Sequence, residues 1–107
     1  MGISLDFRER ILEQLKSILD EQLAGGATRI YLFGSWARHE EKHSSDIDIA
    51  VESSSPIFST TWNNVIEHIE ESTIPYRVDV VDLHKAEKSL VQQVKEEGVL
   101  WKDYTSD

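Results

Sequence analysis

The stretch from Tyr31 to Val51, YLFGSWARHEEKHSSDIDIAV, constrains the fold more than any other part of the sequence. It begins with an apolar run, continues through a Gly-Ser turn and a polar segment, and ends with carboxylates that alternate with isoleucines. Successive side chains of a strand point to opposite faces of a sheet. Asp46 and Asp48 are therefore predicted on one face of a strand, and the two isoleucines on the other, packed face.

The rest of the sequence predicts helices and strands on either side of this stretch. Apolar residues spaced three, four or seven apart indicate a helix that begins at Ser4 or Asp6 and ends at residues 24–26, where two glycines follow an alanine. Asp6 and Glu9 have the spacing of a capping box. The other predicted helices are a brief one within 36–41, one over 62–71 and one over 85–97 that Gly98 ends. The predicted strands are 29–33, 46–51 and 77–83.

This order of elements indicates an α/β (α+β) fold, a small mixed sheet of at least three strands with helices packed on it. The link between the first two strands permits either pairing sense, and the strand order stays open. A chain of 107 residues is long enough for one domain, predicted over 1–107, but too short to add a large substrate-binding domain. Any large substrate is therefore bound largely from outside.

Composition limits the partners and the compartment. The formal net charge of -9, from 20 acidic and 11 basic residues, disfavours direct nucleic acid binding, which depends on cations that displace counterions. The sequence has no cysteine, no signal-peptide core and no apolar run near the length of a membrane span. We therefore expect a cytoplasmic protein with no membrane partner.

The carboxylates and the glycine turn are the residues that suit phosphate chemistry. Asp46 and Asp48 lie about two strand rises, roughly 7 Å, apart along the chain, and a Mg²⁺ or Mn²⁺ ion is a common way to neutralise such a pair. Gly34 lets the backbone approach a ligand closely, and Ser35 offers a hydroxyl and a main-chain donor. A lone Asp-x-Asp is more often an exposed strand face, and a lone Gly-Ser is usually a turn. Together they form a more specific pattern.

LFGSWAR, whose serine is separated by ten residues from DIDIAV, with RVDVV later in the chain, resembles the nucleotidyltransferase superfamily of DNA polymerase beta. In that superfamily an apolar residue precedes Gly-Ser, an Asp-x-Asp strand follows, and a third carboxylate lies on a later strand between apolar neighbours. The resemblance covers about 31–83 and implies a polymerase beta-like nucleotidyltransferase fold. The short chain and the GSWAR and PYRVDVVDL segments are most similar to minimal nucleotidyltransferases, the antitoxin partners of HEPN toxins.

The resemblance implies an enzyme that transfers AMP from ATP, with Mg²⁺ and two ions expected, to a hydroxyl of a separate protein. The expected acceptor is a tyrosine of a HEPN-type toxin, bound in a hetero-oligomer, so that the chain acts as an antitoxin. Two alternatives remain. One is a non-catalytic antitoxin that neutralises the toxin by binding, and the other is nucleotidyl transfer to a small molecule. The intact Gly-Ser and carboxylate set favours the enzyme.

The resemblance also assigns roles to residues. Gly34 and Ser35 are expected to hold the triphosphate. Asp46 and Asp48 are expected to ligate the metal ions. Asp79 is expected to complete the metal site and to help deprotonate the acceptor hydroxyl.

Roles are also expected for neighbouring residues. Arg38 is expected to contact phosphate, with a solvated helix residue as the alternative. Arg77 shares a strand face with Asp79, so it orients that carboxylate, binds phosphate or forms a structural pair. Asp82, three residues beyond Asp79, is expected to cap the strand end. His39 stands where minimal nucleotidyltransferases commonly have glycine, a departure that leaves the metal ligands unchanged.

Overall fold

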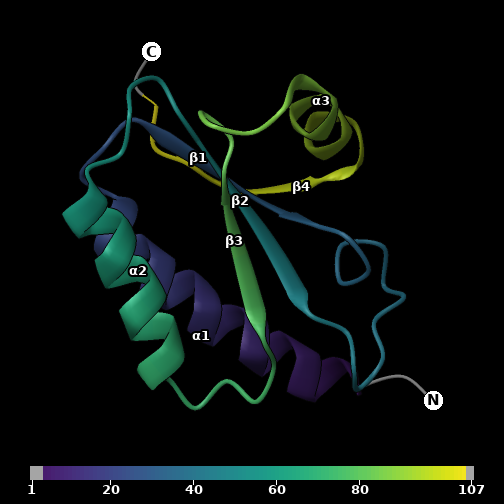
Figure 1. Cartoon of the computed structure of the whole chain (residues 1–107). Coiled ribbons are helices and arrows are strands. Elements are labelled where there is room, and N and C mark those ends of the chain that lie inside the picture. Colours follow the sequence, from purple (N-terminus) through teal and green to yellow (C-terminus); the bar gives the residue numbers. More distant parts are fainter. Residues whose placement is uncertain (1–3, 106–107) are drawn as a thin grey trace.

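The computed structural model of the chain describes residues 4–105. Within this range the elements, in chain order, are α1 (Leu5–Leu23), β1 (Thr28–Phe33), β2 (Ile47–Ser53), α2 (Ser59–Glu71), β3 (Val78–Asp82), α3 (Lys88–Glu97) and β4 (Val99–Asp103). The strands of these described residues form one sheet in the order β3-β2-β1-β4 (Figure 1). β1 runs antiparallel to β2 and β4, whereas β2 and β3 are parallel. The predicted mixed sheet is confirmed, and β4 adds a strand that the sequence patterns did not indicate.

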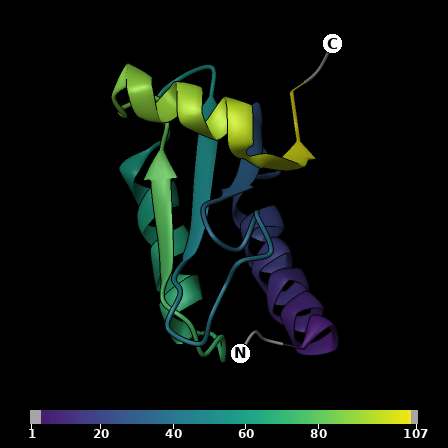
Figure 2. The same ribbon diagram turned by 90° about the vertical axis from the view of Figure 1, so that its right-hand side faces the viewer.

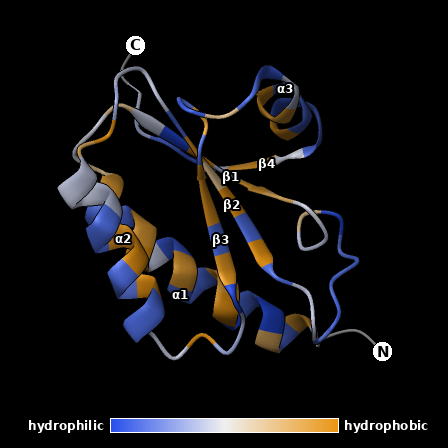
Figure 3. Ribbon diagram, viewed as in Figure 1, coloured by the Kyte–Doolittle hydropathy of each residue, from blue (hydrophilic) through white to orange (hydrophobic). Residues whose placement is uncertain are grey.

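The helices cover both faces of the sheet. α1 and α2 lie side by side on one face, and α3 lies across the other (Figures 1 and 2). Alternation along β2 serves both layers, because Ile47, Ile49 and Val51 pack toward α1 and α2 while Ala50 packs with Val94 of α3. Figure 3 shows the matching apolar sides of the helices turned toward the strands. Asp48 therefore lies on the α3 face.

The helix ends differ from the prediction in their details. The N-cap of α1 is Ser4, whose hydroxyl accepts a hydrogen bond from the amide of Phe7 at 3.3 Å. The predicted Asp6–Glu9 capping box is wrong, because the helix already includes Asp6, which pairs with Arg10 at 3.1 Å instead. α3 begins at Lys88, later than predicted, since 83–85 form a turn and the chain bends at Ala86.

Gly98 ends α3 as predicted, but not through a left-handed conformation. Its φ is −74° and its backbone is extended. Glycine is needed here for space, because a Cβ would overlap the carbonyl oxygen of Val94 and lie 3.4 Å from that of Leu32. The end of α3 is thereby packed directly onto β1.

Residues 34–46, between β1 and β2, contain turns instead of the predicted brief helix over 36–41. The amides of Ala37 and Arg38 both donate to the carbonyl of Gly34, and the amide of Glu40 donates to that of Ser35. These bonds close successive turns but do not build a continuous helical ladder.

None of the helices in 4–105 is both long and apolar enough to cross a membrane.

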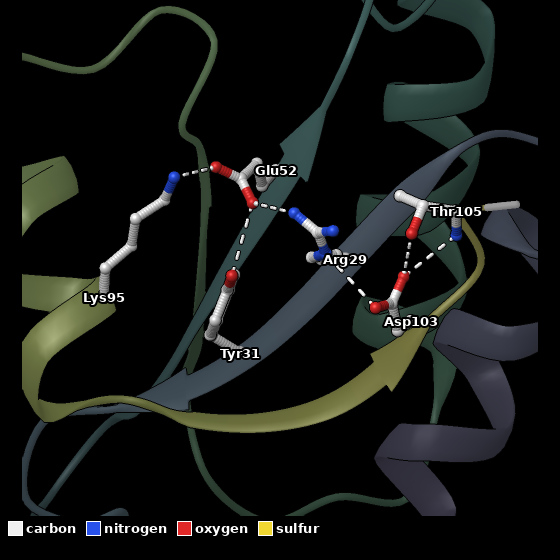
Figure 4. A network of polar contacts seen from close by, with 6 residues as sticks. All are labelled: Arg29, Tyr31, Glu52, Lys95, Asp103 and Thr105. Atoms are coloured by element: carbon white, nitrogen blue, oxygen red, sulfur yellow. Dashed lines mark hydrogen bonds and ion pairs between the residues drawn. The ribbon is translucent and has the colours of Figure 1, made fainter. Parts of the chain in front are cut away.

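A polar network joins α3 to the sheet at the end of β2 farthest from Asp48 (Figure 4). Glu52 accepts from Lys95 of α3 at 2.6 Å and from the Tyr31 hydroxyl at 3.2 Å, and its Oε1 lies 3.5 Å from Arg29. Burial opposes ionisation of Glu52, but its contacts with Lys95, Tyr31 and Arg29 outweigh burial and lower its pKa. This network anchors α3 on its face of the sheet.

Candidate active site

Gly34 follows the last residue of β1 and adopts a conformation that favours glycine. Its φ is +75°, in the left-handed region. A Cβ at this position would overlap Oδ2 of Asp48 and lie 3.2 Å from its Cγ. The Gly-Ser turn and the Asp-x-Asp strand of the sequence are therefore in direct contact, with the glycine backbone against one carboxylate.

The two expected carboxylates of neighbouring strands lie side by side. Asp48 of β2 is the register partner of Asp79 of β3 in a parallel pair, where strands are about 4.8 Å apart. Asp46 precedes β2 directly and is near enough to influence Asp48. The structure thus places all three predicted carboxylates at one end of the sheet.

The environment of Asp48 disfavours its charged form. Partial burial raises the pKa of its carboxyl most, and the charges of Asp79 and then Asp46 raise it further. The positive charge of Arg38 offsets part of this effect. A partly dry carboxylate beside two others is the situation in which a bound cation is most effective.

The donor groups at the site suit a hard cation, although they do not form a closed metal cage. Within residues 4–105, no three His, Asp or Glu side chains converge closely enough to hold a metal ion. The chemistry of the set nevertheless fits Mg²⁺, which takes oxygen ligands and keeps several waters of its own, so that few carboxylates are required. The burial of Asp48 and its repulsion by the two other carboxylates favour the same ion, because a cation would relieve both.

Two arginines border the carboxylates, and each is paired with an acid. Arg38 Nε lies 2.7 Å from Oε1 of Glu40, a contact that raises the pKa of the guanidinium. Arg77 Nε lies 3.5 Å from Oδ1 of Asp79. Both pairs are exposed, so their contribution to stability is small. Arg77 is therefore in place to orient Asp79, one of its predicted roles.

Asp82 has a different environment from Asp79. Its Oδ1 accepts a hydrogen bond from the amide of His84 at 3.0 Å, closing the turn after β3. This is the capping role expected of it. Asp82 pairs in register with Val51, at the opposite end of β3 from the carboxylate group.

Cavities elsewhere on the protein do not include the carboxylates. One of about 300 Å³ lies between the end of α1 and the 53–58 loop, and another of about 300 Å³ lies between α1 and β4. Neither is lined by Asp46, Asp48 or Asp79. The candidate site is the group of carboxylates, because phosphate transfer needs positioned charge more than an enclosed apolar cavity. Asp79, whose side chain is 45% exposed, is accessible to a large acceptor.

Sequence reasoning missed two buried charges beside the site, Arg8 and Glu41, which are each 7% exposed. Arg8 Nε lies 3.2 Å from Oε2 of Glu41, in the 34–46 segment. The sequence contains a signal for Arg8 alone, since it lies on the apolar stripe of α1, three residues before Ile11 and four before Leu12. A charge on a buried stripe requires a partner.

A scan against family models matches residues 13–105 to the polymerase beta nucleotidyltransferase domain. The chain belongs to this family. The matched range includes the Gly-Ser turn and Asp46, Asp48 and Asp79, and the match confirms the predicted fold and the prediction of a nucleotidyltransferase.

Two relatives are both named as protein adenylyltransferases. A probable protein adenylyltransferase MntA of Haemophilus influenzae is 35% identical over 78 residues, which are 73% of this chain and 67% of the relative. A protein adenylyltransferase MntA of Shewanella oneidensis is 37% identical over 73 residues, which are 67% of this chain and 52% of that relative. The chain thus matches between about half and two thirds of the length of these relatives.

Solved structures of similar fold come from toxin–antitoxin complexes. A toxin–antitoxin crystal structure with AMP-PNP matches with a TM-score of 0.69 and 30% identity, covering 83% of this chain and 71% of the other. A tri-AMPylated Shewanella oneidensis HEPN toxin in complex with an MNT antitoxin matches with a TM-score of 0.59 and 26% identity, covering 88% and 71%. The predicted resemblance to minimal nucleotidyltransferase antitoxins is confirmed.

Proposed function

We propose that this chain is a Mg²⁺-dependent protein adenylyltransferase that transfers AMP from ATP to a tyrosine hydroxyl of a partner HEPN toxin and thereby acts as its antitoxin. The observation that carries the proposal is the register pairing of Asp48 with Asp79 beside the backbone of Gly34. The relatives with protein adenylyltransferase names, and the similar antitoxin bound to a tri-AMPylated HEPN toxin, support this acceptor class.

In this proposal the turn holds the nucleotide. Gly34 allows the triphosphate to approach the backbone, and Ser35 donates from its amide and hydroxyl. Arg38 releases Glu40 and contacts phosphate in its place. The Arg38–Glu40 pair is exposed and therefore weak enough to open. The similar toxin–antitoxin structure with AMP-PNP supports an adenine nucleotide at such a site.

Asp46, Asp48 and Asp79 would hold Mg²⁺, which, when bound, would neutralise the triphosphate and stabilise the charge that develops during transfer. The reaction itself is a displacement at the α-phosphorus. The acceptor oxygen forms a bond to that phosphorus, the bond from it to the oxygen bridging to the β-phosphate breaks, and pyrophosphate leaves with the electron pair. The proton of the hydroxyl passes to Asp79, whose carboxylate Arg77 orients.

The acidic charge supports a protein acceptor. With a net charge of -9, the chain is poorly suited to bind DNA or RNA directly, and we propose that it acts in the cytoplasm in a hetero-oligomer with the toxin. Small-molecule acceptors stay a possible outcome of the test below.

The proposal is tested with the purified chain, a purified HEPN toxin encoded beside it, ATP and Mg²⁺. Intact mass spectrometry is expected to show one or more AMP masses on the toxin, and peptide mapping is expected to place them on tyrosine. The chain with both Asp46→Asn and Asp48→Asn should add none, while Asp82→Asn, at the other end of β3, should stay active. If the double variant neutralises the toxin equally well with no added mass, the chain is a binding-only antitoxin. If only small hydroxyl compounds gain AMP, the acceptor class is wrong.

A further inference from the structure

The 34–46 segment connects the two halves of the candidate site, because it begins with the Gly-Ser turn and ends at Asp46. Its backbone conformation is unusual. His39 has a φ of +57°, in the left-handed region, where a side chain is unfavourable. Such a conformation persists only where surrounding contacts hold it. Arg8, far away in the sequence, contacts this segment on both sides of His39, at Trp36 and at Glu41.

We propose that Arg8, Trp36 and Glu41, called here the Arg8 cluster, position the 34–46 segment for nucleotide binding and so set the nucleotide affinity of the site. This inference rests on the proposed function, because it assumes that the nucleotide binds at the Gly-Ser turn and the carboxylates. Arg8 acts through the segment, as a positioning residue.

Within this cluster, Arg8 contacts the segment at two points. Arg8 Nε donates to Oε2 of Glu41 at 3.2 Å, and one terminal nitrogen of Arg8 donates to the carbonyl of Trp36. The guanidinium carbon also lies 5.8 Å from the centroid of the Trp36 ring. A planar group with donors in fixed directions thus determines where both residues lie relative to α1.

Trp36 extends the cluster to the other end of the segment. Its side chain is fully buried, and its Nε1 donates to the carbonyl of Ser45 at 3.4 Å. Trp36 is adjacent in the chain to Ser35, and Ser45 is adjacent to Asp46. Both the phosphate turn and the first carboxylate are therefore one residue away from a contact of the Arg8 cluster.

Stability alone does not account for this buried ion pair. Removing both charges from water is costly, and replacing a buried ion pair with well-packed apolar residues is often neutral or stabilising. The cost here is incompletely offset, since Oε1 of Glu41 is buried with no hydrogen-bond partner among the described residues. The ion pair supplies direction and register, which apolar contacts supply poorly.

The consequence for binding follows from conformational populations. If the segment adopts its binding conformation only about one tenth of the time, the apparent affinity falls about tenfold, although no group that contacts the nucleotide has changed. We expect this result when the ion pair is replaced by apolar side chains of similar size.

The test uses the full chain with Arg8→Met and Glu41→Leu together, which removes both charges and leaves neither unpaired. Isothermal titration calorimetry with Mg²⁺ and a non-hydrolysable ATP analogue should show about tenfold weaker binding. Hydrogen exchange by mass spectrometry should show faster exchange confined to residues 34–46. The single variant Glu41→Gln keeps the side-chain shape. It should bind the analogue with an affinity between those of the unmodified chain and the double variant, and it serves as the test if the double variant does not fold.

A matched control replaces a different ion pair, the one between Lys95 and Glu52, which lies at the end of β2 farthest from Asp48 (Figure 4). Lys95→Met with Glu52→Gln removes the 2.6 Å pair between α3 and the sheet without touching the 34–46 segment. This control should bind the analogue like the unmodified chain. Weakening by the control equal to that of the double variant would overturn the inference, because the effect would then be general destabilisation.

The remaining outcomes separate the two proposals. If the unmodified chain binds the analogue and the double variant binds it equally well, the inference is wrong and the proposed function stands. If the unmodified chain binds no nucleotide, the proposed function is wrong. Unchanged hydrogen exchange over residues 34–46 in the double variant would independently overturn the positioning role of Arg8.

Discussion

Replacing Gly34 with alanine tests the contact on which the site assignment depends. Two costs can be worked out from the structure. An alanine at a φ of +75° carries about 1–2 kcal/mol of left-handed backbone strain. Its Cβ would overlap Oδ2 of Asp48, so that side chain must leave its rotamer, which costs about 0.5–1.5 kcal/mol. The expected loss of unfolding free energy is about 1.5–3.5 kcal/mol.

A double-mutant cycle separates the two costs. Asp48→Ala removes Oδ2 and Cγ and leaves only its Cβ, at an ordinary 3.4 Å from the new methyl group. In that background Gly34→Ala should retain the backbone strain alone, so the coupling energy should be about 0.5–1.5 kcal/mol. Urea unfolding followed by tryptophan fluorescence measures all four proteins, and each 1 kcal/mol corresponds to about 4–8 °C in Tm for a domain of this size.

Gly25→Ala is the matched control. Its Cβ would meet nothing within 4 Å, and its φ is outside the positive range. This change should be neutral or stabilise by about 0.4–1 kcal/mol, because alanine restricts the unfolded chain. If Gly34→Ala costs no more than Gly25→Ala, or if the coupling to Asp48 is zero, the close approach of the turn to the carboxylate is refuted.

Three further changes have expected outcomes. His39→Gly should relieve left-handed strain and stabilise the chain by about 0.5–1 kcal/mol in urea unfolding, and an equal loss would contradict the strained turn. Asp48→Asn should raise the Tm at pH 7 but not below about pH 3.8, the unfolded-state value. The pKa of Asp48 is raised in the folded protein, so its ionisation at higher pH destabilises the fold, and the variant avoids this cost. A gain in Tm that grows toward acid pH would contradict this reasoning. Asp79→Ala should lower AMP transfer about 10²–10⁴-fold, whereas Asp82→Ala should mainly lower the Tm; the reverse ranking would exchange their roles.

The sequence predicted most of the fold where periodicity is strong. The apolar stripe of α1 and the alternation of β2 each indicate one element with one buried face. β4 was missed because its residues, including the exposed Val99 and Leu100, do not alternate and pair only with β1. Strand order also lay beyond the sequence, because it depends on pairings between distant segments that no local pattern encodes.

The candidate site was predictable in its members but not in its contacts. Spacing and resemblance together indicated Gly34, Asp48 and Asp79, and the structure brings them together at one end of the sheet. The spacing gave no indication that Arg8 and Glu41 pair across 33 positions. The brief helix predicted after Ser35 is also absent from the structure. Tertiary contacts of the buried Trp36, which local helical propensity does not reveal, determine the conformation there.

Asp48 and Glu52 lie on the same face of β2, four residues apart, yet their surroundings act in opposite directions. Glu52, held by Lys95, has a lowered pKa, so it stabilises the fold above the usual glutamate value, and this stability is lost as the pH falls through its folded pKa. Asp48 has a raised pKa, and the stability it contributes is present only in acid and is lost as the pH rises through that pKa. A sequence pattern cannot distinguish the two, because both are carboxylates at period-two positions. The structure distinguishes them by their surroundings. Lys95, Tyr31 and Arg29 contact the carboxylate of Glu52, which anchors α3. Asp48 is partly buried beside two other carboxylates, and Arg38 offsets only part of their effect. The fold thus balances the charge of Glu52 at one end of β2 and leaves that of Asp48 unbalanced at the other end. An unbalanced charge of this kind is expected at a site where a bound cation and nucleotide supply the missing positive charge and contacts.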